Sequence, residues 1–159
     1  MAVATVTVDL NVRDLLHEDL AACAWTGSPA QLRYISAALG RRTAGVVDYL
    51  AVCGPSDLPL GVGGVDYSRS RDAGWLWQFA VHPAFRSCGI GTLLVRSAED
   101  RIRGRGLEAA ELGVEAANAG ARRLYARLGY DVVREQDEEW EVSGVRRRSH
   151  CVVMRRRLT

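Results

Sequence analysis

The chain contains 159 residues, of which 48% are hydrophobic and 25% are charged, and its formal net charge is +2. This size and balance are typical of one globular domain, which we expect to span residues 1–159, and they disfavour a disordered chain. The 21 basic residues are all arginine, so a lysine-dependent phosphate loop and Schiff-base chemistry are excluded.

The first half of the chain predicts two helices and three strands. Alternating apolar residues favour an opening strand over residues 3–10. A short helix follows over residues 17–25, and Ser28 and Pro29 are an N-cap and first-turn pair that begin a helix ending near Leu39. Residues 45–53 and 60–67 are rich in β-branched residues and are separated by a Gly-Pro-Ser-Asp turn, which indicates two neighbouring strands.

The second half alternates strands with helices. Residues 75–81 are aromatic and apolar on both faces, as in a central strand covered on both sides. Apolar residues then recur at helical spacing from Ile90 to Ile102. A strand over residues 107–114 and a helix over 118–128 follow, and strands over 130–134 and 151–158 flank an acidic-then-basic hairpin. This order predicts one α/β or α+β domain.

The junction between the strand at 75–81 and the helix after it carries the clearest chemical signal. A helix N-terminus presents unpaired backbone N–H groups and a partial positive charge. Gly89 and Gly91 lack the Cβ atoms that would keep a phosphate from these donors. Arg86 adds a planar guanidinium, and Thr92 a hydroxyl in the first turn. The segment from Arg86 to Thr92 is therefore predicted to bind a phosphate or pyrophosphate.

Two motifs in this region resemble one known family. The run V-H-P-x-F-R-x-x-G-I-G from Val81 to Gly91 is similar to the acyl-CoA-binding signature of the GNAT superfamily of N-acyltransferases. The run N-x-x-A-x-x-L-Y-x-x-L-G-Y from Asn118 to Tyr130 resembles the later motif of the same family. One predicted helix and one strand separate the two motifs, as in the family.

The resemblance implies a fold, a donor and a set of site residues. The fold would be a mixed, mostly antiparallel sheet, splayed at its central parallel strands and covered by helices on both faces. The donor would be acetyl-CoA, bound as a co-substrate without a metal, and the acceptor a small-molecule or protein amine. The residues that would bind acetyl-CoA are Phe79, Ala80 and Val81 along the pantetheine arm, Arg86, Ser87, Cys88, Gly89, Ile90, Gly91 and Thr92 around the pyrophosphate, and Asn118.

Tyr125 is the catalytic residue that the resemblance implies. It would stand near the thioester sulfur and protonate the departing thiolate, which an ordinary tyrosine pKa of about 10 permits. Its helical spacing from Ala121 and Leu128 also fits a core tyrosine. The proton acceptor is not identified, because Trp75 stands where some members of the family carry a glutamate. The alternatives are Asp66, Glu111, Glu115, His82, or no dedicated base.

The four cysteines are widely scattered, which disfavours a zinc site or a disulfide framework. Cys23, Cys53 and Cys151 lie in apolar segments and are expected in the core. Cys88 lies in the glycine loop, where it is either a tolerated small residue or a thiol activated by the helix terminus.

The sequence gives weaker indications of location, partners and assembly than of the donor. No apolar run approaches the roughly 20 residues of a bilayer span, and no basic segment precedes the first apolar stretch, so we expect a cytoplasmic protein without a membrane partner. The small net charge does not indicate a nucleic-acid partner, although the arginine clusters at 146–148 and 155–157 leave nucleic-acid binding as an alternative.

A non-catalytic acyl-CoA-binding module is a second alternative function, and an exposed final strand suggests a homodimer. The acceptor is expected to contact residues 25–30, 66–74 and 136–149.

Overall fold

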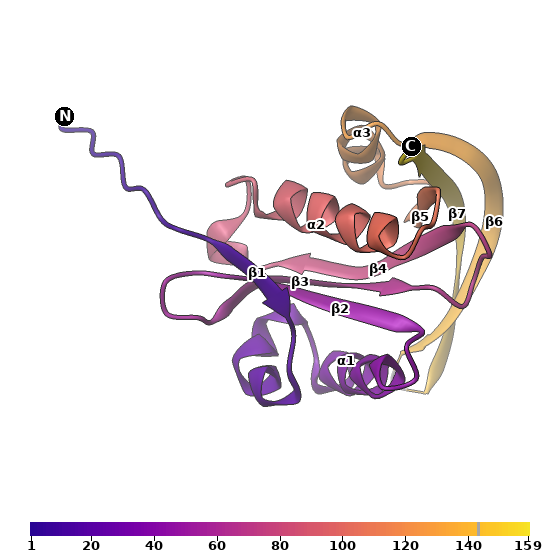
Figure 1. Cartoon of the computed structure of the whole chain (residues 1–159), viewed down its shortest axis with the longest axis horizontal. Coiled ribbons are helices and arrows are strands. Elements are labelled where there is room, and N and C mark those ends of the chain that lie inside the picture. Colours follow the sequence, from indigo (N-terminus) through magenta and orange to yellow (C-terminus); the bar gives the residue numbers. More distant parts are fainter. Residues whose placement is uncertain (143) are drawn as a thin grey trace.

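The computed structural model describes residues 1–142 and 144–159. Figure 1 shows its helices and strands arranged around one sheet. In chain order they are β1 (Asn11–Asp14), η1 (His17–Thr26), α1 (Pro29–Arg42), β2 (Val47–Cys53), β3 (Pro59–Asp66), β4 (Ala73–Val81), η2 (Pro83–Phe85), α2 (Ile90–Gly104), β5 (Ala109–Glu115), α3 (Ala119–Arg127), β6 (Asp131–Val142) and β7 (Val145–Arg157).

The strands form one 7-stranded sheet in the order β1-β2-β3-β4-β5-β7-β6. β4 and β5 are parallel, and every other described pair of neighbours is antiparallel. The crossover between the two parallel strands contains α2, as parallel pairing requires. The predicted mixed, mostly antiparallel sheet with parallel central strands is therefore confirmed.

Helices cover both faces of the sheet (Figure 1). α2 packs on one face, where Leu94, Ala98 and Ile102 join buried residues of the central strands. η1 and α1 pack on the other face, where the second buried cluster includes Cys23 and Ile35. Cys23, Cys53 and Cys151 are buried, which confirms their prediction as core residues, and Cys88 is exposed.

The predicted opening strand over residues 3–10 is wrong. β1 occupies Asn11–Asp14, and residues 1–10 are extended, without an assigned helix or strand. β1 pairs with β2, and Asn11 lies opposite Cys53, the last residue of β2. No residue of β2 remains to pair with the segment before Asn11, so its β-branched side chains, such as Val3 and Val6, stay exposed.

The last two strands are longer than predicted. β6 and β7 run through the acidic and basic stretches, so the hairpin is a continuous two-stranded ladder on either side of its tip. β7 lies between β5 and β6 and is not an edge of the sheet. An exposed final strand therefore does not supply a dimer surface, because β1 and β6 are the edge strands.

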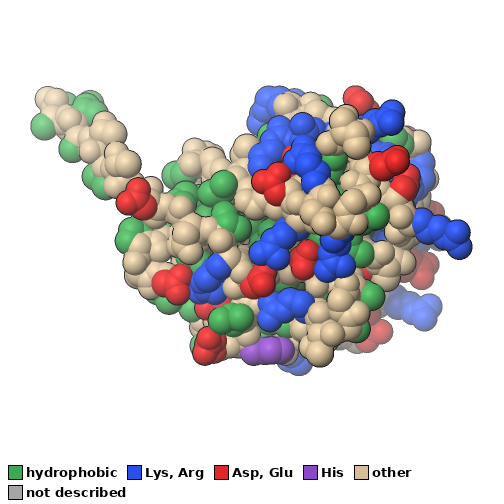
Figure 2. Space-filling model, in the orientation of Figure 1, with side chains coloured by type: hydrophobic (Ala, Val, Ile, Leu, Met, Phe, Trp, Pro, Cys, Tyr) green, Lys and Arg blue, Asp and Glu red, His purple; other side chains and the backbone are tan. Residues whose placement is uncertain are grey.

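Both arginine clusters contain residues paired with carboxylates, Arg148 in the first and Arg155 and Arg156 in the second. In the hairpin, Arg146 lies opposite Glu141 and Arg148 opposite Glu139, an arrangement that stabilises neighbouring strands. In the second cluster, Arg155 bonds Glu111 and Arg156 bonds the buried Glu99. On the face shown in Figure 2, basic and acidic side chains are interspersed rather than gathered into one basic surface.

Among the described residues, no helix has both the length and the apolar character needed to cross a membrane. Over the same residues, no three His, Cys, Asp or Glu side chains are grouped so that they could hold a metal ion.

Candidate active site

The two parallel strands separate beyond their first four paired residues. Their register runs from Ala73 opposite Ala109 to Leu76 opposite Leu112. β4 then continues to Val81 without pairing to β5. A cavity of about 320 Å³, here called the strand cleft, lies in this opening. It is lined by residues 76–79 of β4, residues 112–115 of β5, and Asn118, Ala121 and Tyr125.

A bulge in β4 accompanies the separation. Val62 pairs with Ala80 and Gly64 with Trp77, so both Gln78 and Phe79 lie opposite Gly63. Gln78 takes a left-handed φ of 58°, and its side-chain oxygen accepts a hydrogen bond of 3.0 Å from the Tyr49 hydroxyl. The Phe79 ring lies over Gly63, where a Cβ would come within 2.3 Å of its Cδ1 atom. Such bulges bend a strand and re-aim its side chains.

The loop from His82 to Gly89 connects β4 to α2. The His82 Nδ1 atom accepts a hydrogen bond of 3.1 Å from the Ala84 N–H, which begins η2. Ser87 and Gly89 both have positive φ angles, of 60° and 85°. This conformation is the reason for a glycine immediately before α2. A cavity of about 520 Å³, here called the loop cavity, is lined by Val81, residues 85–87 and 89–92, Gly120, Leu124 and Arg127.

The loop cavity is cationic. Arg86 of the loop and Arg127 at the end of α3 both line it, and no carboxylate is among its lining residues. Within the described part of the chain, neither arginine takes part in an ion pair. The first turn of α2 adds its unpaired N–H groups and dipole. Two free guanidinium groups beside a helix N-terminus make an anion site.

α3 brings Asn118 and Tyr125 to the strand cleft. Tyr125 is partly buried with its ring 5.8 Å from that of Tyr130. Burial raises the pKa of the Tyr125 hydroxyl above its ordinary value, which keeps it protonated at neutral pH. Asn118 is the N-cap of α3, because its Oδ1 atom accepts a hydrogen bond of 3.1 Å from the Ala121 N–H.

The predicted site residues fall into three groups. Phe79, Asn118 and Tyr125 line the strand cleft. Val81, Arg86, Ser87, Gly89, Ile90, Gly91 and Thr92 line the loop cavity. Ala80 and Cys88 line neither: Ala80 packs in the cluster beneath α1, and the exposed Cys88 thiol donates to the Arg86 carbonyl at 3.4 Å.

The prediction missed three residues of α3 that line the loop cavity. Gly120, Leu124 and Arg127 follow one another at intervals of four and three residues, which places them on one helical face. The same spacing in the sequence would have found them, since Asn118 and Tyr125 already placed this helix at the site.

Two of the candidate bases, Asp66 and Glu111, are bonded to arginines. Burial opposes ionisation of Asp66, but hydrogen bonds from Ser68 and Arg41 hold its pKa below the ordinary value. Glu111 is buried and bonds Arg155 at 2.8 Å and Arg134 at 3.4 Å. Both carboxylates are therefore neutralised by guanidinium groups.

The other two candidates lie closer to the cavities. The His82 ring sits between those of Trp25 and Phe85, with centroids at 5.4 Å and 5.5 Å. Its Nδ1 atom is already an acceptor within the loop. Glu115 is exposed, ends β5 and lines the strand cleft.

A third cavity opens on the face of the sheet that α1 covers. It has a volume of about 570 Å³ and is here called the hairpin cavity. Gln31 and Tyr34 of α1, Gln78 of the bulge, and Trp140 and Glu141 of β6 line it. The Tyr34 hydroxyl donates a hydrogen bond of 2.7 Å to the Glu141 carbonyl, which joins α1 to the hairpin. Because Gln78 lines this cavity and the strand cleft, the two adjoin at the bulge.

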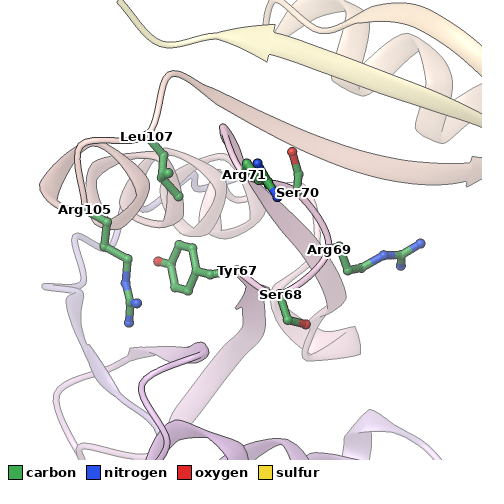
Figure 3. A pocket seen from close by; sticks show the side chains of 7 residues that line it. All are labelled: Tyr67, Ser68, Arg69, Ser70, Arg71, Arg105 and Leu107. Atoms are coloured by element: carbon green, nitrogen blue, oxygen red, sulfur yellow. The ribbon is translucent and has the colours of Figure 1, made fainter.

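A further cavity of about 740 Å³ lies at the other end of the parallel strands (Figure 3). It is lined by residues 67–71, Arg105 and Leu107. Arg105 stacks on Tyr67 at 3.8 Å, and Arg69 stacks on Trp75 at 3.7 Å. In Figure 3 these two arginines extend to opposite sides of the cavity, so their charges do not converge on one ligand.

Parallel strands that diverge beside a cationic helix N-terminus define the N-acyltransferase class predicted from the two motifs. Residues 13–130 match the model of the acetyltransferase (GNAT) family. This segment is well over half of the chain, and the chain therefore belongs to the GNAT family. The family and the fold expected from the sequence are both confirmed.

Individual relatives agree with this assignment. An uncharacterised N-acetyltransferase of Methanocaldococcus jannaschii is 33% identical over 89 residues, which cover 53% of this chain and 39% of the relative. The chain thus spans less than half the length of the curated relatives that it matches. The ribosomal-protein alanine N-acetyltransferase of Escherichia coli has a similar fold, with a TM-score of 0.75 at 18% identity and 95% coverage of both chains. A Salmonella typhimurium protein solved with its cofactor acetyl-CoA has a TM-score of 0.72 at 21% identity, with 94% of each chain covered.

Proposed function

We propose that this chain transfers an acetyl group from acetyl-CoA to a primary amine. The observation that carries the proposal is the adjacency of the strand cleft and the loop cavity. Phe79 and Val81 of β4 line one cavity each, and α3 lines both. An elongated ligand with an anionic group at one end therefore fits along β4.

The residues present fit acetyl-CoA. Residues 77–81 of β4 have no partner on β5, so their backbone is open to a ligand that adds like a strand. Arg86, Arg127 and the first turn of α2 would bind the pyrophosphate. The thioester of the bound co-substrate supplies the acetyl group, and it would lie in the strand cleft beside Tyr125.

Two groups of the chain would assist the transfer. A backbone N–H of the open part of β4 would stabilise the negative charge that develops on the acetyl oxygen. Tyr125 would donate its phenolic proton to the departing sulfur, and burial keeps this proton in place at neutral pH.

The acceptor would enter through the hairpin cavity, which adjoins the strand cleft at Gln78. Tyr34 and Trp140 contribute aromatic rings there, and such rings bind apolar groups and cations. These contacts favour a primary amine with an apolar or aromatic body. The named acceptors of structural relatives, spermidine and a ribosomal-protein alanine, are the natural comparison compounds.

The test begins with the donor. Isothermal calorimetry should show acetyl-CoA binding, and Arg86→Ala and Arg127→Ala should each weaken it about tenfold to a hundredfold through lost charge-assisted hydrogen bonds. Arg123→Ala is the matched control, because this exposed arginine of α3 lines neither cavity. Absent binding, or equal effects of all three variants, would contradict the proposed donor site.

The second step follows thiol release with phenethylamine, spermidine and an alanine-terminated peptide as acceptors. We expect phenethylamine to be acetylated fastest, and Trp140→Ala to raise its KM without changing the affinity for acetyl-CoA. Tight acetyl-CoA binding with no amine-dependent release would instead support the non-catalytic module, the reading that Trp75 at the family's glutamate position suggests.

A further inference from the structure

Gly113 marks the point where β5 leaves β4. It follows Leu112, the last residue paired with β4, and it lines the strand cleft. Leu112 and Val114 point into the core beneath α2, so Gly113 faces the opposite side of the sheet. A Cβ on Gly113 would lie 3.3 Å from Cζ2 of Trp75 and 4.0 Å from Oε1 of Glu138.

Glu138 reaches this point from β6. It pairs with Ser149 of β7, and two residues back Gln136 pairs with Cys151, which in turn pairs with Glu115 of β5. These residues share one face of the sheet. The β6–β7 hairpin bends toward α1 at this end of the molecule (Figure 1). The curvature brings the Glu138 carboxylate over the backbone of β5.

The Glu138 carboxylate is held through one of its two oxygens. Gln136 Nε2 donates a hydrogen bond of 2.5 Å to its Oε1 atom, and Arg69 approaches the same atom at 3.5 Å. Arg69 itself stacks on Trp75 at 3.7 Å. The Oε2 atom of Glu138 has no hydrogen-bond partner among the described residues, and the Glu138 side chain is 29% exposed. One oxygen is thus oriented and the other is open.

Glu138 places a carboxylate beside Trp75, the β4 residue that cannot itself accept a proton. Trp75 occupies the β4 position at which the sequence resemblance leads one to look for a glutamate. Its parallel partner Glu111 is bonded to two arginines. Glu138 instead lies beside the Trp75 ring, on the face from which an acceptor would leave the hairpin cavity.

Resting on the proposed function, we infer that Glu138 is the proton acceptor of the reaction and recognises its substrate as a cationic primary amine. Glu138 binds the ammonium group and takes one proton from it. The nitrogen then bonds to the acetyl carbon as the carbon–sulfur bond breaks, and Tyr125 gives its proton to the sulfur. The second nitrogen proton restores Tyr125, and Glu138 releases its proton to solvent. Each turnover frees one proton, one amide and one thiol.

The charged and titratable groups on the surrounding elements set the field at Glu138. They are Tyr34 on α1, Arg69 in the β3–β4 turn, Glu111 and Glu115 on β5, Arg134 on β6, and Arg147, Cys151 and Arg155 on β7. Arg134 and Arg155 are paired with Glu111 and Asp72. The two remaining arginines are matched in number by Glu115 and Glu138, so the surrounding groups present no net positive charge to an ammonium ion at Glu138.

The test compares Glu138→Gln with Glu139→Gln by thiol release at saturating acetyl-CoA, with phenethylamine as the acceptor. Glu139 is the matched control, because it is exposed and alternates onto the other face of β6. At pH 7 we expect Glu138→Gln to lower kcat/KM about a hundredfold and Glu139→Gln to leave it near wild type. Calorimetry should give all three proteins the same affinity for acetyl-CoA.

The pH profile separates proton transfer from a structural defect. The loss in Glu138→Gln should shrink below about tenfold as the pH approaches the amine pKa near 10, because a neutral amine needs no base. A structural defect would persist at every pH. If phenethylamine is not acetylated, the same comparison is made with spermidine or the alanine-terminated peptide, the other amine acceptors of the screen.

Two outcomes would overturn the inference while leaving the proposed function standing. One is an active wild type whose Glu138→Gln variant matches Glu139→Gln. The other is a pH-dependent loss in Glu115→Gln with none in Glu138→Gln, which would move the role to the carboxylate that lines the strand cleft. Failure of wild type to bind acetyl-CoA would instead remove the proposed function itself.

Discussion

At the scale of single residues, Tyr125 combines a position in the strand cleft with a hydroxyl that resists ionisation. Tyr125→Phe removes the proton and keeps the ring that packs against Tyr130. We expect kcat to fall about a hundredfold, while the affinity for acetyl-CoA measured by calorimetry stays near wild type. Because burial raises the pKa of this hydroxyl, wild-type kcat should not decline between about pH 7 and pH 9.5.

The opposite result for Tyr125 would be equally informative. Unchanged kcat in Tyr125→Phe would indicate that Tyr125 is a core residue whose hydroxyl contacts solvent, which is the other interpretation of its helical spacing. Loss of acetyl-CoA binding in the same variant would assign it to donor binding rather than to proton transfer.

His150 offers a pH-dependent contact on the outer face of the hairpin. Its ring lies 3.0 Å from Asp137 and 3.1 Å from Glu135, and hydrogen bonds to these two residues raise its pKa above 6.5. Since the folded-state pKa is raised, the stabilising effect is complete below 6.5 and is lost as the pH rises through the folded value. NMR titration should show this elevated pKa in wild type and a value closer to 6.5 in Asp137→Asn. Titration of wild type at or below 6.5 would contradict the contact.

At the scale of elements, a buried carboxylate ties α2 to the last strand. Glu99 is fully buried, accepts a hydrogen bond of 2.9 Å from the Tyr130 hydroxyl, and pairs with Arg156 of β7 and Arg96 of α2. Glu99→Gln should lower the free energy of unfolding by about 2 kcal/mol, because it removes the charge that Arg156 and Arg96, both partly exposed, bond to in the core. Urea unfolding measures this loss.

The neighbouring residue provides the control for Glu99. Asp100 pairs with Arg103 on the exposed side of α2, and its side chain is 75% exposed. Asp100→Asn should therefore cost at most about 1 kcal/mol. Similar losses in both variants would show that Glu99 contributes no more than a surface ion pair.

The elements also show which parts of the fold the sequence could predict. The strand, loop and helix around Gly89 depend on local pattern, since periodicity and glycine chemistry act within a few residues. The strand predicted over residues 3–10 failed because strand formation needs a partner, and β2 ends opposite Asn11. The hairpin was predicted too short because β6 and β7 are charged strands, paired by opposite charges rather than by apolar alternation.

The candidate site divides in the same way. The loop residues from Arg86 to Thr92 are close in sequence, and apart from Cys88 they all line the loop cavity. Arg127 shares the loop cavity with Arg86 only because α3 packs beside the open strands. Glu138 reaches Gly113 only because the hairpin bends, which no spacing in the sequence indicates.

At the scale of the whole molecule, acetyl-CoA binding should stabilise the fold, because one ligand would contact β4, the loop, α2 and α3 together. β4 and β5 are not paired with each other beyond Leu76 and Leu112, and the loop, α2 and α3 surround the opening between them. A ligand that binds only the folded state stabilises it by about 2.7 kcal/mol at a hundred times its Kd. For a domain of this size, that corresponds to a rise in Tm of about 5–10 °C.

Thermal unfolding with and without acetyl-CoA measures the whole effect, and hydrogen exchange locates it. Within residues 77–81, the backbone amides that point away from β3 should gain protection, because they have no partner on β5 until a ligand pairs with them. Pantetheine alone should produce a much smaller rise in Tm, since it lacks the pyrophosphate that Arg86 and Arg127 would bind. The double variant Arg86→Ala, Arg127→Ala should lose most of the difference between the two ligands. An equal rise with both ligands would show that the loop cavity does not bind the anionic end of acetyl-CoA.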